Sequence, residues 1–217
     1  MAGGIAHEIN NPLFVLKTKI ETLEKVLIKK QDSEKEIESI IVAKKMVHKI
    51  TDIIKSLSTL SRSSENDPIQ SISIQDVLNE TLVVCNHRFY LKGIKITQNI
   101  KQDLPKIPCR PVELGQVFIN LLNNAYDAME ETIDPEVKIQ AKVLEKKVIV
   151  TVANNGPSIP GEIREKIFQS FYTTKELGKG TGLGLSISQK LIEKNNGKLY
   201  LASDKDLTKF VIELPVS

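Results

Sequence analysis

The sequence predicts two domains, an N-terminal α-helical hairpin that pairs with a second copy into a dimeric four-helix bundle, and an α+β sandwich behind it. Apolar side chains at alternating three- and four-residue spacing fill the first sixty residues, as in helices that pack along one seam. Residues 61–71 are polar, contain a proline and lack periodicity, as a linker would. After them, helical and strand-like stretches alternate, which is typical of a sheet covered by helices. We place the boundaries at 1–63 for the hairpin, 64–71 for the linker and 72–217 for the second domain.

The hairpin consists of two long amphipathic helices, one from about residue 2 to 30 and one from about 34 to 60. The seam of the first is Leu13, Leu16, Ile20, Leu23 and Leu27; that of the second is Ala43, Met46, Ile50, Ile53, Leu57 and Leu60. A single hairpin buries too little apolar surface to be stable alone, so we expect a homodimer.

The second domain reads as a mixed sheet with helices on one face. Alternating apolar residues predict the strands, including a hairpin, and glycine, proline and polar clusters separate the elements. The expected strands are 93–100, 137–143, 147–153, 198–202 and 209–214; the expected helices are 76–84, 115–129, 160–168 and 183–195; 104–111 is a proline-rich loop and 173–180 a polar loop.

Composition is that of an ordinary globular protein, with 217 residues of which 41% are apolar. The net charge, 30 − 27 = +3, is spread along the chain and gives no case for nucleic acid or an anionic membrane as partner. Two distant cysteines, Cys85 and Cys109, predict reduced thiols. The sequence contains neither a membrane-spanning apolar run nor a signal peptide, so we expect a cytoplasmic protein, or the cytosolic part of a longer one.

A polar stripe runs along the otherwise apolar helix at 115–129. Gln116, Asn120 and Asn124 lie at i, i+4 and i+8, while Val117 and Leu121 occupy core-facing positions. Buried amides need partners, and a bound phosphate–metal unit would supply them. The alternative is a helix with a solvated edge.

Near the start of the first helix, the segment AHEINNPL places His7 and Asn11 on one helical face with Glu8 beside them. A carboxylate next to an imidazole can accept its Nδ1 proton and leave Nε2 as a nucleophile. This segment resembles the phosphoacceptor box of sensor histidine kinases of the nitrogen-regulation type. The resemblance implies that His7 is phosphorylated, that Glu8 is the general base and that Asn11 helps to dephosphorylate a response regulator.

Segments of the second domain resemble the nucleotide-binding boxes of the GHKL ATPases, the family that includes histidine kinases. The resemblance implies that Asn124 holds the Mg²⁺ of bound ATP and that Asn120 lines the same pocket; oxygen ligands suit Mg²⁺. It implies further that the glycines of GTGLGLS contact phosphate through their backbone, at the start of a helix, as glycines permit. For Lys175, a phosphate contact and a solvated side chain are equally open. The remaining positions that it assigns to nucleotide binding are Asn154, Gly156, Ile159, Phe171, Gly180, Thr181, Gly182, Leu183, Gly184, Leu185 and Thr208.

Two positions depart from the family pattern in NNGPSI. Asn154 stands where the family has the aspartate that accepts the adenine amino proton, and Ser158 replaces a glycine. An amide keeps one acceptor oxygen but replaces the other with a donor, which would weaken ATP binding by roughly ten- to a hundredfold. One alternative is that NNGPSI is an ordinary turn between a strand and a helix. The other is that it binds nucleotide weakly because of Asn154, as a variant of natural or engineered origin.

The resemblance covers essentially the whole chain and predicts a sensor histidine kinase core. It would transfer the γ-phosphoryl group of Mg·ATP to His7 and then to an aspartate of a response-regulator receiver domain. Two alternatives remain: a phosphatase or regulatory dimer impaired in nucleotide binding by Asn154, and a GHKL ATPase of the chaperone or mismatch-repair class without phosphohistidine.

Overall fold

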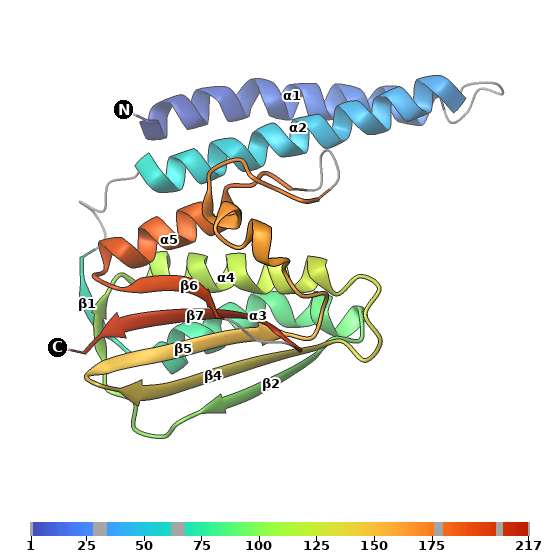
Figure 1. The fold of residues 1–217 in the computed structure, drawn as a ribbon. Helices are drawn as coiled ribbons and strands as arrows, with labels where there is room; N and C mark the ends of the chain where they lie inside the picture. Colours follow the sequence, from blue (N-terminus) through green and yellow to red (C-terminus); the bar gives the residue numbers. More distant parts are fainter. Residues whose placement is uncertain (1, 28–33, 62–67, 176–179, 203–205, 217) are drawn as a thin grey trace. The chain divides into compact units, whose positions relative to one another are not determined.

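Figure 1 shows the computed structural model of the chain, which describes all residues except 1, 28–33, 62–67, 176–179, 203–205 and 217. In residues 2–12, 26, 34, 35, 48, 49, 52, 53 and 55–61 it describes the backbone alone. The chain forms two compact units. The helical unit comprises Met1–Glu65 with Ser170–Leu183, and the sheet unit comprises Asn66–Gln169 with Gly184–Ser217.

The helical unit contains the two predicted long helices, α1 (Ala2–Leu27) and α2 (Glu34–Ser61). They pack along their length (Figure 1) around a small apolar core of Leu13, Ile20, Val47 and Ile54. An ion pair of 2.6 Å between Lys44 and Glu24 joins the two helices beside this core. The hairpin itself is therefore confirmed.

The predicted seam is only partly buried within this hairpin. Leu13 and Ile20 are buried, whereas Leu16 and Leu23 expose 48% and 55% of their surface, and Ile50 exposes 43%. Only one stripe of each amphipathic helix can face the other helix, so the remaining seam positions lie on another side.

The sheet unit is built on a five-stranded mixed sheet with the strand order β2-β4-β5-β7-β6. Its strands are β2 (Lys95–Ile100), β4 (Glu136–Leu144), β5 (Lys147–Asn154), β6 (Lys198–Ala202) and β7 (Thr208–Pro215). The β2–β4 pair is parallel and the other pairs are antiparallel. The predicted mixed sheet and its central hairpin are confirmed.

Three helices gather on one face of this sheet (Figure 1). They are α3 (Ile74–Leu91), α4 (Pro111–Ala128) and α5 (Gly184–Lys194). The positions expected to be core on α4, among them Val117, Leu121 and Ala125, are buried. Alternate residues of β4, β5 and β7 are buried as well, so the core lies between the helices and one face of the sheet.

Three local expectations differ from the structure. The segment predicted as a loop contains β3 (Ile107–Cys109), which pairs with β1 (Gln70–Ile72); Pro108 is tolerated there because the strand is short and lies at a sheet edge. The helix expected at 76–84 extends to Leu91, and the one expected at 160–168 is two 3₁₀ turns, η2 (Gly161–Ile163) and η3 (Lys166–Phe168).

Cys85 and Cys109 are both buried and present as thiols, as predicted, and burial raises the pKa of the Cys85 thiol. In the part of the chain that the structure describes, no helix is long and apolar enough to cross a membrane.

Candidate functional site

The polar stripe of α4 divides into residues that join helices and one that does not. The Asn120 amide donates to the Gly184 carbonyl at 3.2 Å and to the Ser188 hydroxyl at 3.1 Å, both on α5. Its Oδ1 accepts a hydrogen bond of 3.0 Å from Gln116. Gln116 and Asn120 therefore fix α4 against α5 through their side chains.

Asn124 lies one turn further along α4 and is half-buried. Its side chain makes no hydrogen bond with any other described residue. An unengaged amide oxygen on a rigid helix is a suitable single ligand for a hard cation such as Mg²⁺, which takes its other ligands from water and phosphate. The residues present therefore fit the metal that the resemblance implies.

A second cluster lies at the end of β5, where two neighbouring asparagines differ in their hydrogen bonds. Asn155 uses both atoms of its amide: Oδ1 accepts from the Glu136 N–H at 2.8 Å, and Nδ2 donates to the Asp134 carbonyl at 2.9 Å. Asn154 exposes only 3% of its surface, and its buried Nδ2 has no hydrogen-bond partner. An unpaired buried donor costs about 1–3 kcal/mol, so an acceptor atom of a ligand at this position would offset that cost.

The backbone around Asn154 leaves little room. A Cβ at Gly156 would lie 2.8 Å from the Ala128 carbonyl oxygen and 2.9 Å from Asn154 Nδ2, so only glycine fits there. Thr208 is the β7 partner of Asn154, and its hydroxyl donates to the Pro157 carbonyl at 3.1 Å. The structure thus brings Asn154, Gly156 and Thr208 together into one corner, which we call the Asn154 corner.

The predicted positions Phe171, Lys175 and Gly180–Leu183 belong to the helical unit and lie on either side of residues 176–179, which the structure does not describe. The Phe171 N–H donates to the Gly182 carbonyl at 2.9 Å, and Gly182 has a left-handed backbone with φ of 68°. Phe171 also has positive φ, 70°, and exposes 62% of its surface, so its ring is not part of the core.

Further hydrogen bonds shape the same loop. The Thr181 hydroxyl accepts from the Leu183 N–H at 3.3 Å, and the Thr173 hydroxyl accepts from the Lys175 N–H at 3.2 Å. A Cβ at Gly180 would come within 2.6 Å of that same Thr173 hydroxyl. These hydrogen bonds define the conformation of residues 171–175 and 180–183. A side chain at Gly180 or Gly182 would collide with a neighbouring atom in that conformation.

Gly184 and Leu185 open α5 in the sheet unit. The first N–H groups of a helix have no partner within it and carry its positive dipole end, which suits an anionic group. Ser188, fully buried one turn later, donates to the Gly184 carbonyl at 2.8 Å and so tightens this end. Sequence reasoning missed Ser188, although a small polar residue four positions after Gly184 in an apolar helix was a usable signal.

The remaining predicted site residues are Ile159 in the sheet unit and His7, Glu8 and Asn11 on α1. Ile159 is half-buried, and its carbonyl accepts from Arg164 Nε at 3.3 Å. His7, Glu8 and Asn11 have helical backbone within α1, but their side chains lie outside the description.

Comparison with known proteins identifies the relatives of this chain. Residues 109–217 match the family described as histidine kinase-, DNA gyrase B-, and HSP90-like ATPase. Sporulation kinase E of Bacillus subtilis (strain 168) is 30% identical over 217 residues, which is 100% of this chain and 28% of the relative. The chain spans less than half the length of the curated relatives that it matches.

Solved structures of histidine kinases are similar to this chain as well. The catalytic domain of the histidine kinase ThkA superposes with a TM-score of 0.61 at 33% identity, over 68% of this chain and 95% of that chain. The structure of ThkA in complex with the response regulator protein TrrA gives a TM-score of 0.68 at 26% identity, over 98% of this chain and 60% of that chain.

Proposed function

Since the chain belongs to the histidine kinase-, DNA gyrase B-, and HSP90-like ATPases and contains the ATP-binding core of a sensor histidine kinase, we propose that it phosphorylates its own His7 from Mg·ATP. The phosphoryl group then passes to an aspartate of a response-regulator receiver domain. The co-structure of a similar kinase with a response regulator supports this second step.

The observation that carries the proposal is the Asn154 corner. It is a confined polar site at the end of β5, closed by Gly156 and Thr208, and it keeps a buried polar atom without a partner. We assign the purine base of ATP to this corner, with the Asn154 amide facing the base.

The phosphate groups belong to other residues. The first turn of α5, beginning at Gly184, presents the positive end of the helix dipole, and the resemblance assigns the loop glycines Gly180 and Gly182 and Lys175 to phosphate as well. Asn124 is assigned to Mg²⁺, which when bound would neutralise charge on the phosphates. The protein's own contribution is then to position the phosphates and to stabilise charge.

His7 is assigned as the phosphoacceptor, with Glu8 holding the Nδ1 proton and Asn11 acting when the response regulator is dephosphorylated. In this assignment residues 1–63 form the dimerisation and phosphotransfer domain, 64–71 the linker and 72–217 the catalytic domain. Exposed apolar side chains of the hairpin, among them Leu16 and Leu23, support pairing with a second copy into a four-helix bundle.

One alternative is favoured by a specific observation. The unpaired Nδ2 of Asn154 would mismatch a site that evolved around a carboxylate, which supports a chain with weak nucleotide affinity that acts as a phosphatase or a regulatory dimer. An ATPase without a phosphohistidine is the third possibility.

The test is incubation with Mg·ATP labelled at the γ-phosphate, comparing the chain with His7→Gln and Asn154→Asp. A working kinase takes up acid-labile, base-stable label that His7→Gln abolishes. Label in Asn154→Asp alone supports the impaired variant. Inorganic phosphate released equally by the chain and by His7→Gln, without protein-bound label, supports the plain ATPase and contradicts the kinase.

A further inference from the structure

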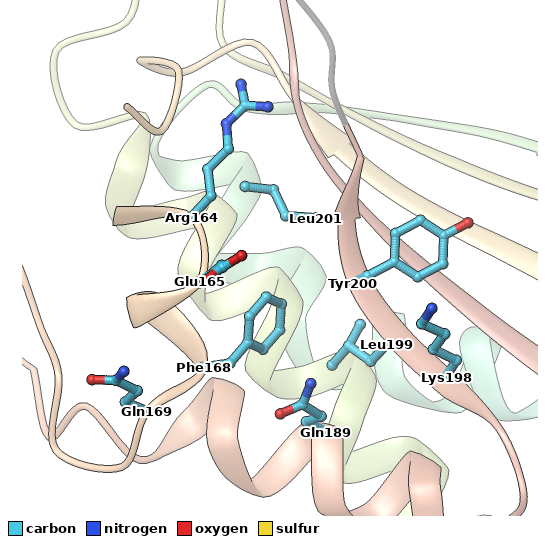
Figure 2. Close-up of a pocket in the computed structure, with 9 residues that line it drawn as sticks. All are labelled: Arg164, Glu165, Phe168, Gln169, Gln189, Lys198, Leu199, Tyr200 and Leu201. Atoms are coloured by element: carbon cyan, nitrogen blue, oxygen red, sulfur yellow. The ribbon is translucent and has the colours of Figure 1, made fainter. Parts of the chain in front are cut away.

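A groove of about 470 Å³ lies in the sheet unit, and its lining includes none of the residues of the Asn154 corner (Figure 2). We call it the β6 groove. Three segments line it: the two 3₁₀ turns, helix α5 and strand β6. The lining residues are Arg164, Glu165, Phe168, Gln169, Gln189 and Lys198–Leu201.

The groove runs along the edge of the sheet. Strand β6 is the last in the strand order, and among the described residues only β7 pairs with it. Consecutive residues of a strand point to opposite faces, yet Lys198, Leu199, Tyr200 and Leu201 all line the groove. A hollow bordered by both faces of one strand must follow the strand's edge.

An edge of this kind carries unused backbone hydrogen-bonding groups. In an antiparallel pair, every second residue directs both its N–H and its C=O away from the partner strand. These outward-directed N–H and C=O groups can pair with a further strand. Natural proteins usually cover such an edge or carry residues on it that prevent pairing. Here the edge opens into the groove.

The groove has an apolar floor. Leu199 is buried at 1% exposure, and Leu201 and Phe168 are half-buried beside it. The Phe168 ring packs edge-to-face on Phe210 of β7 with 6.4 Å between centroids, so it is held in place. An apolar side chain of a ligand would find a rigid surface here.

The rim of the groove is mainly basic. Arg164 and Lys198 lie toward opposite ends in Figure 2, and Glu165 is the one acidic residue in the lining. The Tyr200 hydroxyl donates to Glu213 at 3.0 Å. Hydrogen bonds from Lys147 first, and from Tyr200 second, lower the pKa of the Glu213 carboxyl, so this carboxylate stays charged and keeps the Tyr200 ring fixed.

We propose that the β6 groove binds an extended segment of a partner protein as an added strand on β6, with apolar side chains toward Phe168 and acidic side chains toward Arg164 and Lys198. Backbone pairing would provide the affinity and the alternating side chains the specificity. A second copy of this chain fits less well, because each copy would bring its own Arg164 and Lys198 to the shared edge. None of the lining residues is assigned to the nucleotide, and Arg164 contacts the assigned residue Ile159 only through its backbone carbonyl.

The probe is the fluorescein-labelled peptide acetyl-Glu-Val-Glu-Val-Glu-Val-Glu-amide, followed by fluorescence anisotropy with the full chain. Saturable binding is expected, with slower hydrogen exchange of the β6 amides in the complex. The same peptide with proline in place of the central valine should fail to bind, since proline removes the N–H that a strand needs. A Lys-Val peptide should also fail, because its charges match those of the rim.

Two variants test the assigned residues independently. Lys198→Glu reverses an exposed rim charge, and Gln189→Glu adds a negative charge from α5; each should weaken peptide binding at least about tenfold. Lys166→Glu is the matched control, because Lys166 is exposed but does not line the groove, and it should leave binding unchanged.

Three results would overturn the proposal. One is no binding at about 1 mM peptide, the weakest affinity worth assigning to a site. Another is equal binding of the proline peptide, which would exclude strand pairing. The last is self-association of the chain through β6 that competes with the peptide, which would assign the edge to a second copy.

Discussion

Two adjacent asparagines, Asn154 and Asn155, show how differently one residue type can be used. Asn155 is saturated by Glu136 and Asp134 and holds the turn that follows β5. Asn154 is nearly as enclosed as a core residue, yet one of its donors has no partner. The hydrogen bonds within the fold explain Asn155, whereas those of Asn154 are incomplete, as expected for the base-binding role proposed for it.

Replacing Asn154 with aspartate should separate ligand binding from folding. The carboxylate accepts a charge-assisted hydrogen bond from the adenine amino group, so Asn154→Asp should tighten ATP binding about ten- to a hundredfold, measured by calorimetry. The ligand-free chain should become less stable to urea, because a carboxylate at this 3%-exposed position is buried without a paired donor.

The neighbouring Asn155→Asp provides the control. It removes the donor to the Asp134 carbonyl and should cost about 1–3 kcal/mol of stability without tightening ATP binding. Equal ATP affinities for the chain and Asn154→Asp would remove Asn154 from the base site.

At the scale of elements, the functional side of the sheet unit depends on how α4 meets α5. Asn120 donates to both Gly184 and Ser188, and at the opposite end of α5 Lys194 and Asn195 bond the Glu113 carboxylate of α4 at 3.0 and 3.1 Å. The helix carrying Asn124 and the helix beginning at Gly184 are therefore fixed to each other at both ends.

Removing the Asn120 amide should weaken the contact between α4 and α5. Asn120→Ala is expected to lower the free energy of unfolding by about 1–3 kcal/mol, because it leaves Gln116 and the Gly184 carbonyl with fewer partners. Urea denaturation measures the change. Asn99→Ala, at an exposed position of β2, should stay within about 0.5 kcal/mol of the parent, and a similarly small effect of Asn120→Ala would contradict the assigned role.

The loop between 170 and 183 depends on Gly182. Gly182→Ala would place a Cβ against the Phe171 backbone at a left-handed φ, which costs about 1–2 kcal/mol from the backbone alone. We expect the loop to open, so that trypsin cleaves faster after Lys175 and ATP binds more weakly. Gly161→Ala, where a Cβ would meet open space, should change neither property. Unaltered cleavage in Gly182→Ala would show that the loop tolerates the shift.

At the scale of the whole molecule, the hairpin leaves part of its apolar surface uncovered. Leu16, Leu23 and Ile50 are exposed although they lie in the repeating seam, whereas Leu13 and Ile20 are buried. A monomeric hairpin has no use for such residues at regular helical spacing. This pattern supports the proposed homodimer.

The dimer can be tested without unfolding the hairpin, because the chosen leucines contribute little to its internal core. Leu16→Glu combined with Leu23→Glu should weaken dimerisation at least about tenfold, measured by sedimentation equilibrium, while helix content by circular dichroism is retained. Lys19→Glu, also exposed on α1, is the control and should remain dimeric. A double variant that stays dimeric would place the dimer interface elsewhere.

The sequence by itself determined the elements that local patterns specify. Apolar repeats predicted the hairpin and the central strands, and the stripe of amides predicted the polar side of α4. These predictions succeed because periodicity and backbone propensity depend only on residues close together in the sequence. The family resemblance likewise came from local motifs, and the family match confirms it. The pairing of β1 with β3 was missed because two three-residue strands carry almost no period.

Only the tertiary structure decided how residues of one kind divide into roles. In the sequence, Asn120 and Asn124 are equivalent members of one stripe, and Asn154 and Asn155 are neighbours in one turn. Their hydrogen bonds separate Asn120 and Asn155, which join elements, from Asn124, which makes no side-chain hydrogen bond with a described residue, and Asn154, whose buried Nδ2 has no partner; these two are the residues that we propose for ligand binding. The β6 groove likewise exists only once β6 becomes the last strand of the sheet. The physical reason is the same throughout: a polar group's role depends on which partners packing brings within hydrogen-bond distance, and those partners lie far away in the sequence.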